Sequence, residues 1–192
     1  PFIDPGIILD ADRPKDYFKI IEFNEDKSCP SLKLCGDIQD YFQMSEDVKA
    51  HSDKVLMLAL DISNHLYKRG LLLNKKIIMA SCLLHDIAKG RPQHAKLGGD
   101  WLEDMGYIEI AQIVKEHMEL QSIPKVPMEK EVVYLADKMV IGHKVVTIDE
   151  RFSSKETLYR DKPKVLERIK HRKNQAIEVY NLIYKGESYE TN

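Results

Sequence analysis

Residues 77–94 of this chain, IIMASCLLHDIAKGRPQH, join a strongly apolar run to a group of chemically active side chains. The run up to Leu84 is apolar on every side, which predicts a buried helix over about residues 74–87. His85 and Asp86 stand at the inner end of this helix. Burying a carboxylate without a partner is costly, so Asp86 needs a cation, and a metal ion is the most economical one. A His-Asp pair is a weak signal alone, so the rest of the chain must support it.

The composition is that of an ordinary globular protein. The chain has 192 residues, 43% of them apolar and 31% charged, which suits one domain with a substantial core and a helical lean. With 29 basic and 31 acidic residues the formal charge is −2, so no basic field indicates binding to nucleic acid or to a membrane surface. No apolar run approaches the roughly 20 residues that span a bilayer, and the first residues do not resemble a signal peptide.

The three cysteines, Cys29, Cys35 and Cys82, form neither an even set nor a close metal-binding pair. Unpaired thiols are typical of a reducing compartment, which predicts a cytoplasmic protein.

The chain divides into an N-terminal arm, residues 1–30, and an all-α body, residues 31–192. In the arm we expect a short extended piece at 6–9 and a helix through about Asn24, capped by Asp12. In the body, apolar residues recur mostly at spacings of three and four. They predict helices ending near Gln43, from Ser45 to Gly70, over 74–87 and 93–105, through Ile110 to His117, and over 129–141, 154–161 and 163–185, with an irregular segment from Gly142 to Ser154.

Several of these helices point a metal-binding side chain inward. The residues are His51, His85 with Asp86, His117 and Asp137, and His94 begins a further helix. A single inward histidine is more often a hydrogen-bonded core residue than a ligand. Together, however, three histidines and two acids would each need a separate polar niche, whereas one shared cation satisfies them all. The other histidines, His65, His143 and His171, have polar neighbours and are expected on the surface.

Imidazole and carboxylate ligands without a thiolate suit Mn, Fe, Co, Ni or Zn. Six candidate ligands are more than one tetrahedral ion needs, so we expect one or two divalent ions. Two ions about 3.5–4 Å apart, bridged by a carboxylate, would use the whole set. Such a centre activates water and binds phosphate oxygens, so hydrolysis of a phosphate ester is the reaction that fits best.

The order His51, then His85-Asp86, then Asp137 resembles the HD-domain metal-dependent phosphohydrolase superfamily over about residues 45–145. The segment LLHDIAK at residues 83–89 carries much of the likeness. The resemblance implies an all-α HD-domain helical bundle with a short N-terminal appendage. It also implies Asp86 as a bridging ligand and His51, His85 and Asp137 as metal ligands.

His94 and His117 resemble the additional ligands of HD proteins that hold two metals, among them cyclic-di-GMP phosphodiesterases and bacterial diadenosine-tetraphosphate hydrolases. No Gly-Tyr-Pro motif follows, which argues against cyclic di-GMP. Asp86 and Lys89 are the candidate catalytic residues. Lys89 and Arg151 are candidates for contacting a substrate phosphate, although Lys89 suits a solvated helix end equally well.

The segment ILDADRPKDY at residues 8–17 is similar to the Asp-x-Asp-Thr-Pro-Glu-Asp-Tyr segment near the end of molybdenum-cofactor-type nucleotidyltransferases, with Arg13 in place of Thr. This likeness implies that the chain is the C-terminal part of a fused transferase–HD protein; the alternative is a simple arm with a capped helix. Two functions follow. The first is hydrolysis of a small phosphorylated substrate such as a nucleotide. The second is a regulatory metal- and nucleotide-binding module serving a fused or partner transferase.

Overall fold

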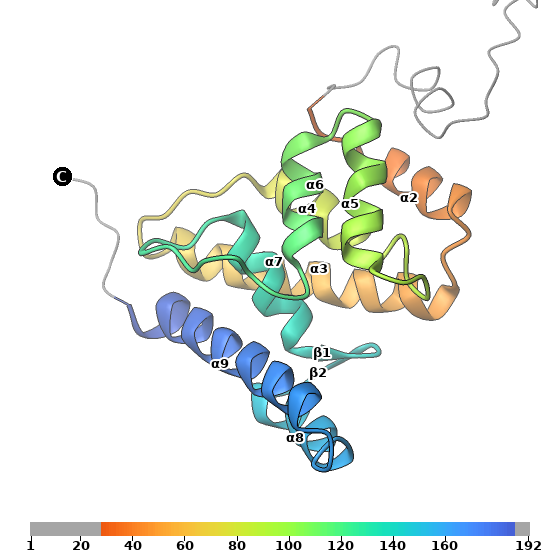
Figure 1. Ribbon diagram of the computed structural model, residues 1–192. Helices are drawn as coiled ribbons and strands as arrows, with labels where there is room; N and C mark the ends of the chain where they lie inside the picture. Colours follow the sequence, from red (N-terminus) through yellow and green to blue (C-terminus); the bar gives the residue numbers. More distant parts are fainter. Residues whose placement is uncertain (1–27, 187–192) are drawn as a thin grey trace, which may run out of the picture.

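The computed structural model describes residues 28–186 of the chain (Figure 1). The expected N-terminal elements, at 6–9 and through Asn24 with its Asp12 cap, lie outside these residues. The described chain forms α2 (Leu32–Tyr41), α3 (Glu46–Tyr67), α4 (Lys75–Leu84), α5 (His94–Asp104), α6 (Ile108–Glu116), α7 (Glu129–Lys138), β1 (Val140–Ile141), β2 (Lys144–Val145), α8 (Ile148–Leu158) and α9 (Pro163–Lys185). The all-α class is confirmed, with one small hairpin added.

The apolar helix α4 lies at the centre and packs against α2, α3, α6 and α7 (Figure 1). It begins at Asn74, whose side chain accepts hydrogen bonds from the N–H groups of Lys76 and Ile77. Every residue from Ile77 to Leu84 except Met79 is buried, as expected of a helix that is apolar all round. Because α4 ends at Leu84, the residues that follow emerge directly from the middle of the core.

The longest helix of the core, α3, begins after Ser45 as expected and ends at Tyr67. Gly70 has φ +88°, a left-handed conformation that glycine adopts without strain, and the N–H of Leu71 returns to the carbonyl of Leu66. Along its length α3 packs against both α4 and α7. The helix therefore holds one edge of the core in place.

Helices α5 and α6 form a close antiparallel pair (Figure 1). Gly99 on α5 makes this approach possible, because a Cβ added there would lie 2.9 Å from the carbonyl oxygen of Ala111 on α6. The neighbouring Gly98 faces Ile87, where an added Cβ would lie 3.1 Å from a side-chain carbon. Two successive glycines thus set the distance between the helices that carry His94 and His117.

The segment after α7 differs from the prediction. Helix α7 ends at Lys138 rather than near 141, and β1 and β2 pair antiparallel around Gly142, which has φ +58°. Helix α8 begins at Ile148, where an irregular segment was expected. Thr147 and Glu150 form a capping box: the hydroxyl of Thr147 accepts from the N–H of Glu150, and the Glu150 carboxylate accepts from the N–H of Thr147. This pair is a sequence signal for a helix start that the prediction missed.

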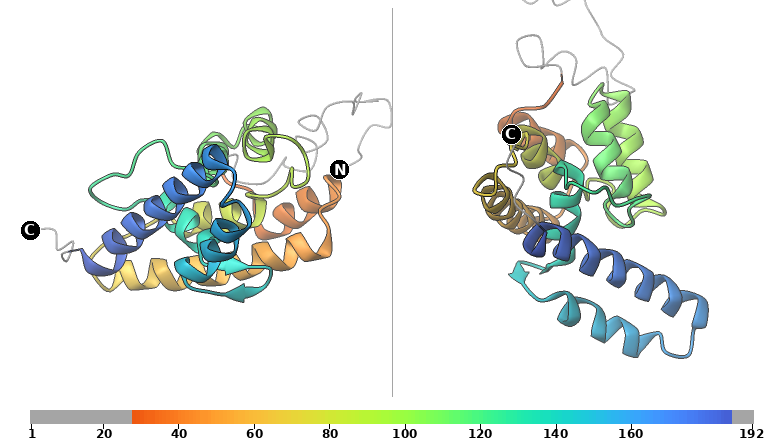
Figure 2. Two further views of the ribbon diagram at one scale, coloured as in Figure 1. Left: turned by 60° about the horizontal axis from the view of Figure 1, so that its bottom comes forward. Right: turned by 90° about the vertical axis from the view of Figure 1, so that its left-hand side faces the viewer.

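Helices α8 and α9 lie side by side and extend together away from the other helices (Figure 2). The bounds of α9 match the prediction, and its buried face packs against α7. Within residues 28–186, none of the helices is both long enough and apolar enough to cross a membrane.

One histidine is placed differently from the prediction. His65, expected on the surface, is half-buried, and its ring centroid lies 4.8 Å from that of Tyr184 on α9. The C-terminal part of α9 lies against the end of α3 and covers His65. The polar neighbours of His65 in the sequence gave no sign of this contact. His143 and His171 are exposed, as expected. The three cysteines are all buried, and burial raises the pKa of the Cys82 thiol.

Candidate metal centre

Two helices of the core end in a histidine held in the same way. His85 is the C-cap of α4, and its Nδ1 lies 2.7 Å from the carbonyl oxygen of Cys82. His117 is the C-cap of α6, and its Nδ1 lies 2.7 Å from the carbonyl oxygen of Val114. The last carbonyls of a helix lack partners within the helix, so each ring satisfies one of them. Each ring then points its Nε2 away from its helix.

A third histidine is held by the β-hairpin. His51 on α3 places its Nδ1 2.9 Å from the carbonyl oxygen of Gly142, which lies between β1 and β2. Its Nε2 lies 3.2 Å from Oδ1 of Asp137 on α7. The hairpin, which the sequence did not predict, therefore orients one of the predicted site residues.

These contacts fix the tautomers of the three rings. A carbonyl oxygen can only accept a hydrogen bond, so each Nδ1 must carry the proton. In a neutral ring Nε2 then presents a bare lone pair. All three Nε2 atoms face carboxylate oxygens, which are acceptors too. A cation between the nitrogen and oxygen atoms removes this conflict, and a backbone-held Nδ1 is the usual support of a metal-binding imidazole.

Asp86 divides its two oxygens between two sides of the site. Oδ1 lies 3.3 Å from Nε2 of His94 and 3.6 Å from Nε2 of His117. Oδ2 lies 3.4 Å from Nε2 of His85 and accepts a hydrogen bond of 2.7 Å from Nζ of Lys89. Its side chain is only 2% exposed. Such a carboxylate is placed to bridge two ions.

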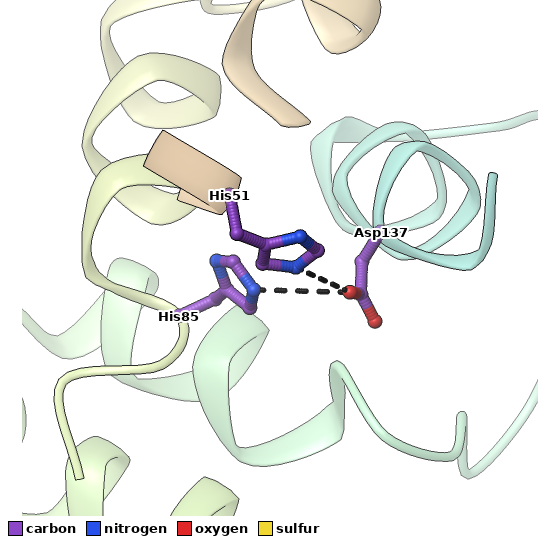
Figure 3. A group of neighbouring side chains, drawn as sticks. All are labelled: His51, His85 and Asp137. Atoms are coloured by element: carbon purple, nitrogen blue, oxygen red, sulfur yellow. Dashed lines mark hydrogen bonds and ion pairs between the residues drawn. The ribbon is translucent and has the colours of Figure 1, made fainter. Parts of the chain in front are cut away.

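The candidate ligands form two groups in the described part of the chain. One is His51, His85 and Asp137, and the other is Asp86, His94 and His117. Within each group the ligand atoms lie within 4.8 Å of one another. Figure 3 shows the first group, with His51 and His85 both pointing toward Asp137. The donor set of imidazole nitrogen and carboxylate oxygen suits a divalent transition metal.

Buried polar atoms without a hydrogen-bond partner concentrate in the second group and beside it. Among residues 28–186 they include Nε2 of His85, His94 and His117 and Oδ1 of Asp86. A buried polar atom left unpaired costs free energy, and so many at one point would be expensive for the fold. All four are atoms that a metal ion would bind. The residues therefore fit the ion that their chemistry implies.

Asp137 is held by two cations. Its Oδ2 accepts a hydrogen bond of 2.7 Å from Nζ of Lys138, and Nη2 of Arg151 lies 3.8 Å from its Oδ1. Lys138 is buried and also donates to the carbonyl oxygen of His117 at 2.7 Å. Both contacts engage the Lys138 side chain inside the protein, so it is not available to a substrate phosphate.

The charges shift the protonation of the site. Burial raises the pKa of both Asp86 and Asp137, but other effects outweigh it. At Asp86 they are the charge of His85 and hydrogen bonds with the surrounding histidines, and at Asp137 chiefly the charge of Lys138, so both carboxyls have pKa values well below the ordinary range. Burial lowers the pKa of His85, but the charge and hydrogen bond of Asp86, together with the charge of Asp137 and the carbonyl of Cys82, outweigh burial, so the pKa is raised. For His117 burial prevails and the pKa falls to about 4. The two acids are thus anionic across the physiological range.

Three cationic side chains stand around the site with contact to solvent. Lys89 is 49% exposed while bound to Asp86, and Arg151 is anchored by a hydrogen bond of 2.6 Å to the carbonyl oxygen of Val140. Lys155 lies one turn after Arg151 on the same face of α8 and has no ion-pair partner within the described chain. Desolvation, then the charge of Arg151, lower the pKa of Lys155.

The structure brings all six predicted ligands to one place, from α3, α5, α7 and the ends of α4 and α6. Lys89 and Arg151 lie beside them. Sequence reasoning missed Lys155. A spacing of four from Arg151 was the available signal for Lys155, but the predicted helix began after Arg151, at about residue 154.

A helical body that gathers histidines and aspartates from five elements around one buried point defines a metal-binding helical bundle. Residues 48–140 match the family model of the HD domain, which supports the resemblance of this segment to the HD-domain metal-dependent phosphohydrolase superfamily. Proteins of this family are generally metal-dependent hydrolases. No curated protein and no solved structure gives a significant match to the chain.

Proposed function

We propose that this protein is a metal-dependent phosphohydrolase or phosphodiesterase that cleaves a phosphate ester or anhydride of a small nucleotide or related metabolite. One observation carries the proposal. Three imidazoles whose Nδ1 protons are taken by backbone carbonyls direct their free Nε2 atoms at two buried carboxylates. This arrangement is electrostatically unfavourable without a cation.

The chemistry that divalent metal ions supply when bound is a water molecule of lowered pKa and a Lewis-acidic contact to phosphate oxygens. Asp86 would belong to both ligand groups, with His51, His85 and Asp137 on one side and His94 and His117 on the other. Two ions of Mn, Fe, Co, Ni or Zn suit this ligand set.

The protein's own cations would receive the substrate. Lys89, Arg151 and Lys155 approach from two different segments and keep part of each side chain in solvent. Ammonium and guanidinium groups make strong, charge-assisted hydrogen bonds to phosphate. Lys89 is also placed to neutralise charge that develops on the leaving oxygen, because its Nζ lies at the rim and is held by Asp86.

Elemental analysis of the purified protein, combined with phosphate release from a panel of nucleotides and phosphodiesters, tests the proposal. We expect about two transition-metal ions per chain and hydrolysis that stops after chelation and returns with metal. Asp86→Ala should lose metal and more than about 100-fold of the activity while keeping its helical circular dichroism. His143→Ala, which changes an exposed histidine, is the matched control and should alter neither property.

Two results would contradict the proposal. One is a wild-type protein that retains no metal after reloading with each of the five ions. The other is an Asp86→Ala variant that hydrolyses the same substrate at the wild-type rate.

A further inference from the structure

An aromatic cavity lies apart from the metal centre. It has a volume of about 460 Å³ and is lined by Tyr41, Phe42, Gln43, Arg91 and Trp101. The rings of Phe42 and Trp101 stack in parallel, with centroids 4.2 Å apart and an interplanar angle of 8°. Tyr41 meets Phe42 edge-on at 5.1 Å. Phe42 and Trp101 also pack against the hydrophobic core, and both line the cavity.

The cavity is connected to the metal centre through two segments. Trp101 follows His94 by seven residues on α5, which places it on the same face, about 10 Å along the helix axis. Arg91 lies in the loop between Asp86 and His94. A nucleotide spans a comparable length from its base to its phosphate.

The other wall of the cavity follows α2, which is fixed to the same centre. Gln39 on α2 donates a hydrogen bond of 2.8 Å to the carbonyl oxygen of Leu83, two residues before His85. Asp40 accepts a bond of 2.7 Å from Lys49, two residues before His51. The residues that carry Tyr41 and Phe42 are therefore held rigidly relative to two of the candidate ligands.

One face of Trp101 can be opened to a ligand. The guanidinium of Arg91 lies 5.3 Å from the ring centroid. Because the Phe42 ring at 4.2 Å leaves no room over the face it covers, Arg91 lies over the opposite face. Arg91 is exposed and has no ion-pair partner among residues 28–186. A planar ligand can therefore take its place on the indole while the guanidinium turns to the ligand's phosphate.

We propose that this cavity binds the base of a nucleotide whose phosphate lies at the metal centre. Stacked aromatic rings accept any base, because every base presents a π face. Gln43, with φ +55°, adds an amide that can both donate to and accept from a base edge. This inference rests on the proposed function for the position of the phosphate.

Trp101 is the only tryptophan of the chain, so its fluorescence reports on the cavity directly. Metal-free protein would be titrated with AMP, GMP, CMP and UMP, and with ribose 5-phosphate as the ligand without a base. We expect saturable quenching by the nucleotides and none by ribose 5-phosphate. Equal responses to all five ligands, or no response to any, would overturn the inference.

Variants provide a second measurement that does not use Trp101 as the probe. Tyr41→Ala should raise KM for a hydrolysed nucleotide about tenfold and leave kcat nearly unchanged, because stacking contributes about 1–3 kcal/mol per base. Arg91→Ala should also raise KM, because it removes a charge-assisted contact to the phosphate. Tyr41→Ala should leave KM for ribose 5-phosphate unchanged, because this substrate has no flat ring to stack. Arg160→Ala and Tyr67→Ala, at exposed positions elsewhere, are the matched controls.

The two proposals fail in distinguishable ways. Quenching by nucleotides in a protein that hydrolyses none of them would preserve the base site and reject the hydrolase. Hydrolysis of ribose 5-phosphate and AMP with equal kcat/KM, unaffected by Arg91→Ala, would preserve the hydrolase and reject the base site.

Discussion

Nζ of Lys138 lies 2.7 Å from Oδ2 of Asp137, its neighbour in the chain, and both side chains are almost completely buried. Burial lowers the pKa of Lys138, but the lysine also donates to the carbonyl of His117. One ammonium group therefore joins α7 to the end of α6. By occupying Oδ2, it leaves Oδ1 of Asp137 facing His51 and His85.

Replacing this lysine should damage stability and metal binding together. Lys138→Met leaves a buried carboxylate without its nearest cation, and breaking a buried pair in this way costs about 3–5 kcal/mol. Thermal unfolding of metal-free protein measures the loss, and metal content should fall as well. Lys96→Met, which breaks an exposed pair with Asp100, should change stability by less than about 0.5 kcal/mol. An equal effect of both variants would refute the role given to Lys138.

Metal affinity should rise with pH. The pKa of His85 is raised in the metal-free protein, so at acidic pH its Nε2 holds a proton that metal binding must release. Below that raised pKa, each unit of acidification should weaken binding about tenfold for one released proton. Above it, affinity should level off. Isothermal titration with Mn²⁺ or Zn²⁺ at several pH values, in two buffers of different ionisation enthalpy, counts the protons. An affinity that does not change with pH would contradict the release of a proton from His85 on metal binding.

Adding a Cβ at Gly99 should destabilise the contact between α5 and α6. Gly99→Ala places a Cβ against the carbonyl of Ala111, so we expect a loss of about 1–3 kcal/mol and weaker metal retention by the group containing His94 and His117. Gly36 on α2 has open space around it, so Gly36→Ala should raise stability by up to about 1 kcal/mol. Chemical denaturation compares the two. If both substitutions stabilise the protein, the close approach of α5 and α6 at Gly99 is wrong.

Lys155 should act on substrate binding alone. Its side chain has no carboxylate partner in the described chain, and it shares a helix face with Arg151. Lys155→Ala should raise KM for a phosphate substrate about fivefold to tenfold without changing metal content or stability. Lys164→Ala, an exposed lysine at the start of α9, is the control. Steady-state kinetics at two salt concentrations test this, and an unchanged KM would remove Lys155 from the site.

Sequence periodicity is sufficient for most of the fold and for selecting the six candidate ligands. Spacings of three and four place His51 on the inward face of α3 and Asp137 on that of α7, whereas the resemblance to the HD family grouped the two as ligands. The hairpin could not be predicted in the same way. Two pairs of strand residues are too short for an alternating pattern, although Gly142 gave a hint of a turn.

Other features left no trace in local sequence. The backbone carbonyls that hold His51, His85 and His117 have no side-chain signature, and the pairing of His65 with Tyr184 joins distant parts of the chain. The start of α8, by contrast, does have a local signal. Thr147 and Glu150 form a capping box, which begins the helix although the composition around it is irregular. The features that sequence reasoning did not predict are therefore mostly those that depend on contacts between distant parts of the chain.

The three carbonyls that take the Nδ1 protons belong to the main chain, at Cys82, Val114 and Gly142. Every amino acid supplies this group, so substitution at these positions cannot delete the acceptor, only displace it. The orientation of the three histidine rings is therefore insensitive to substitution at these positions. If the acceptors were side chains, a single substitution could remove one. A protein engineer could vary Val114 to reshape the surroundings of the centre while the tautomer of His117 stays the same.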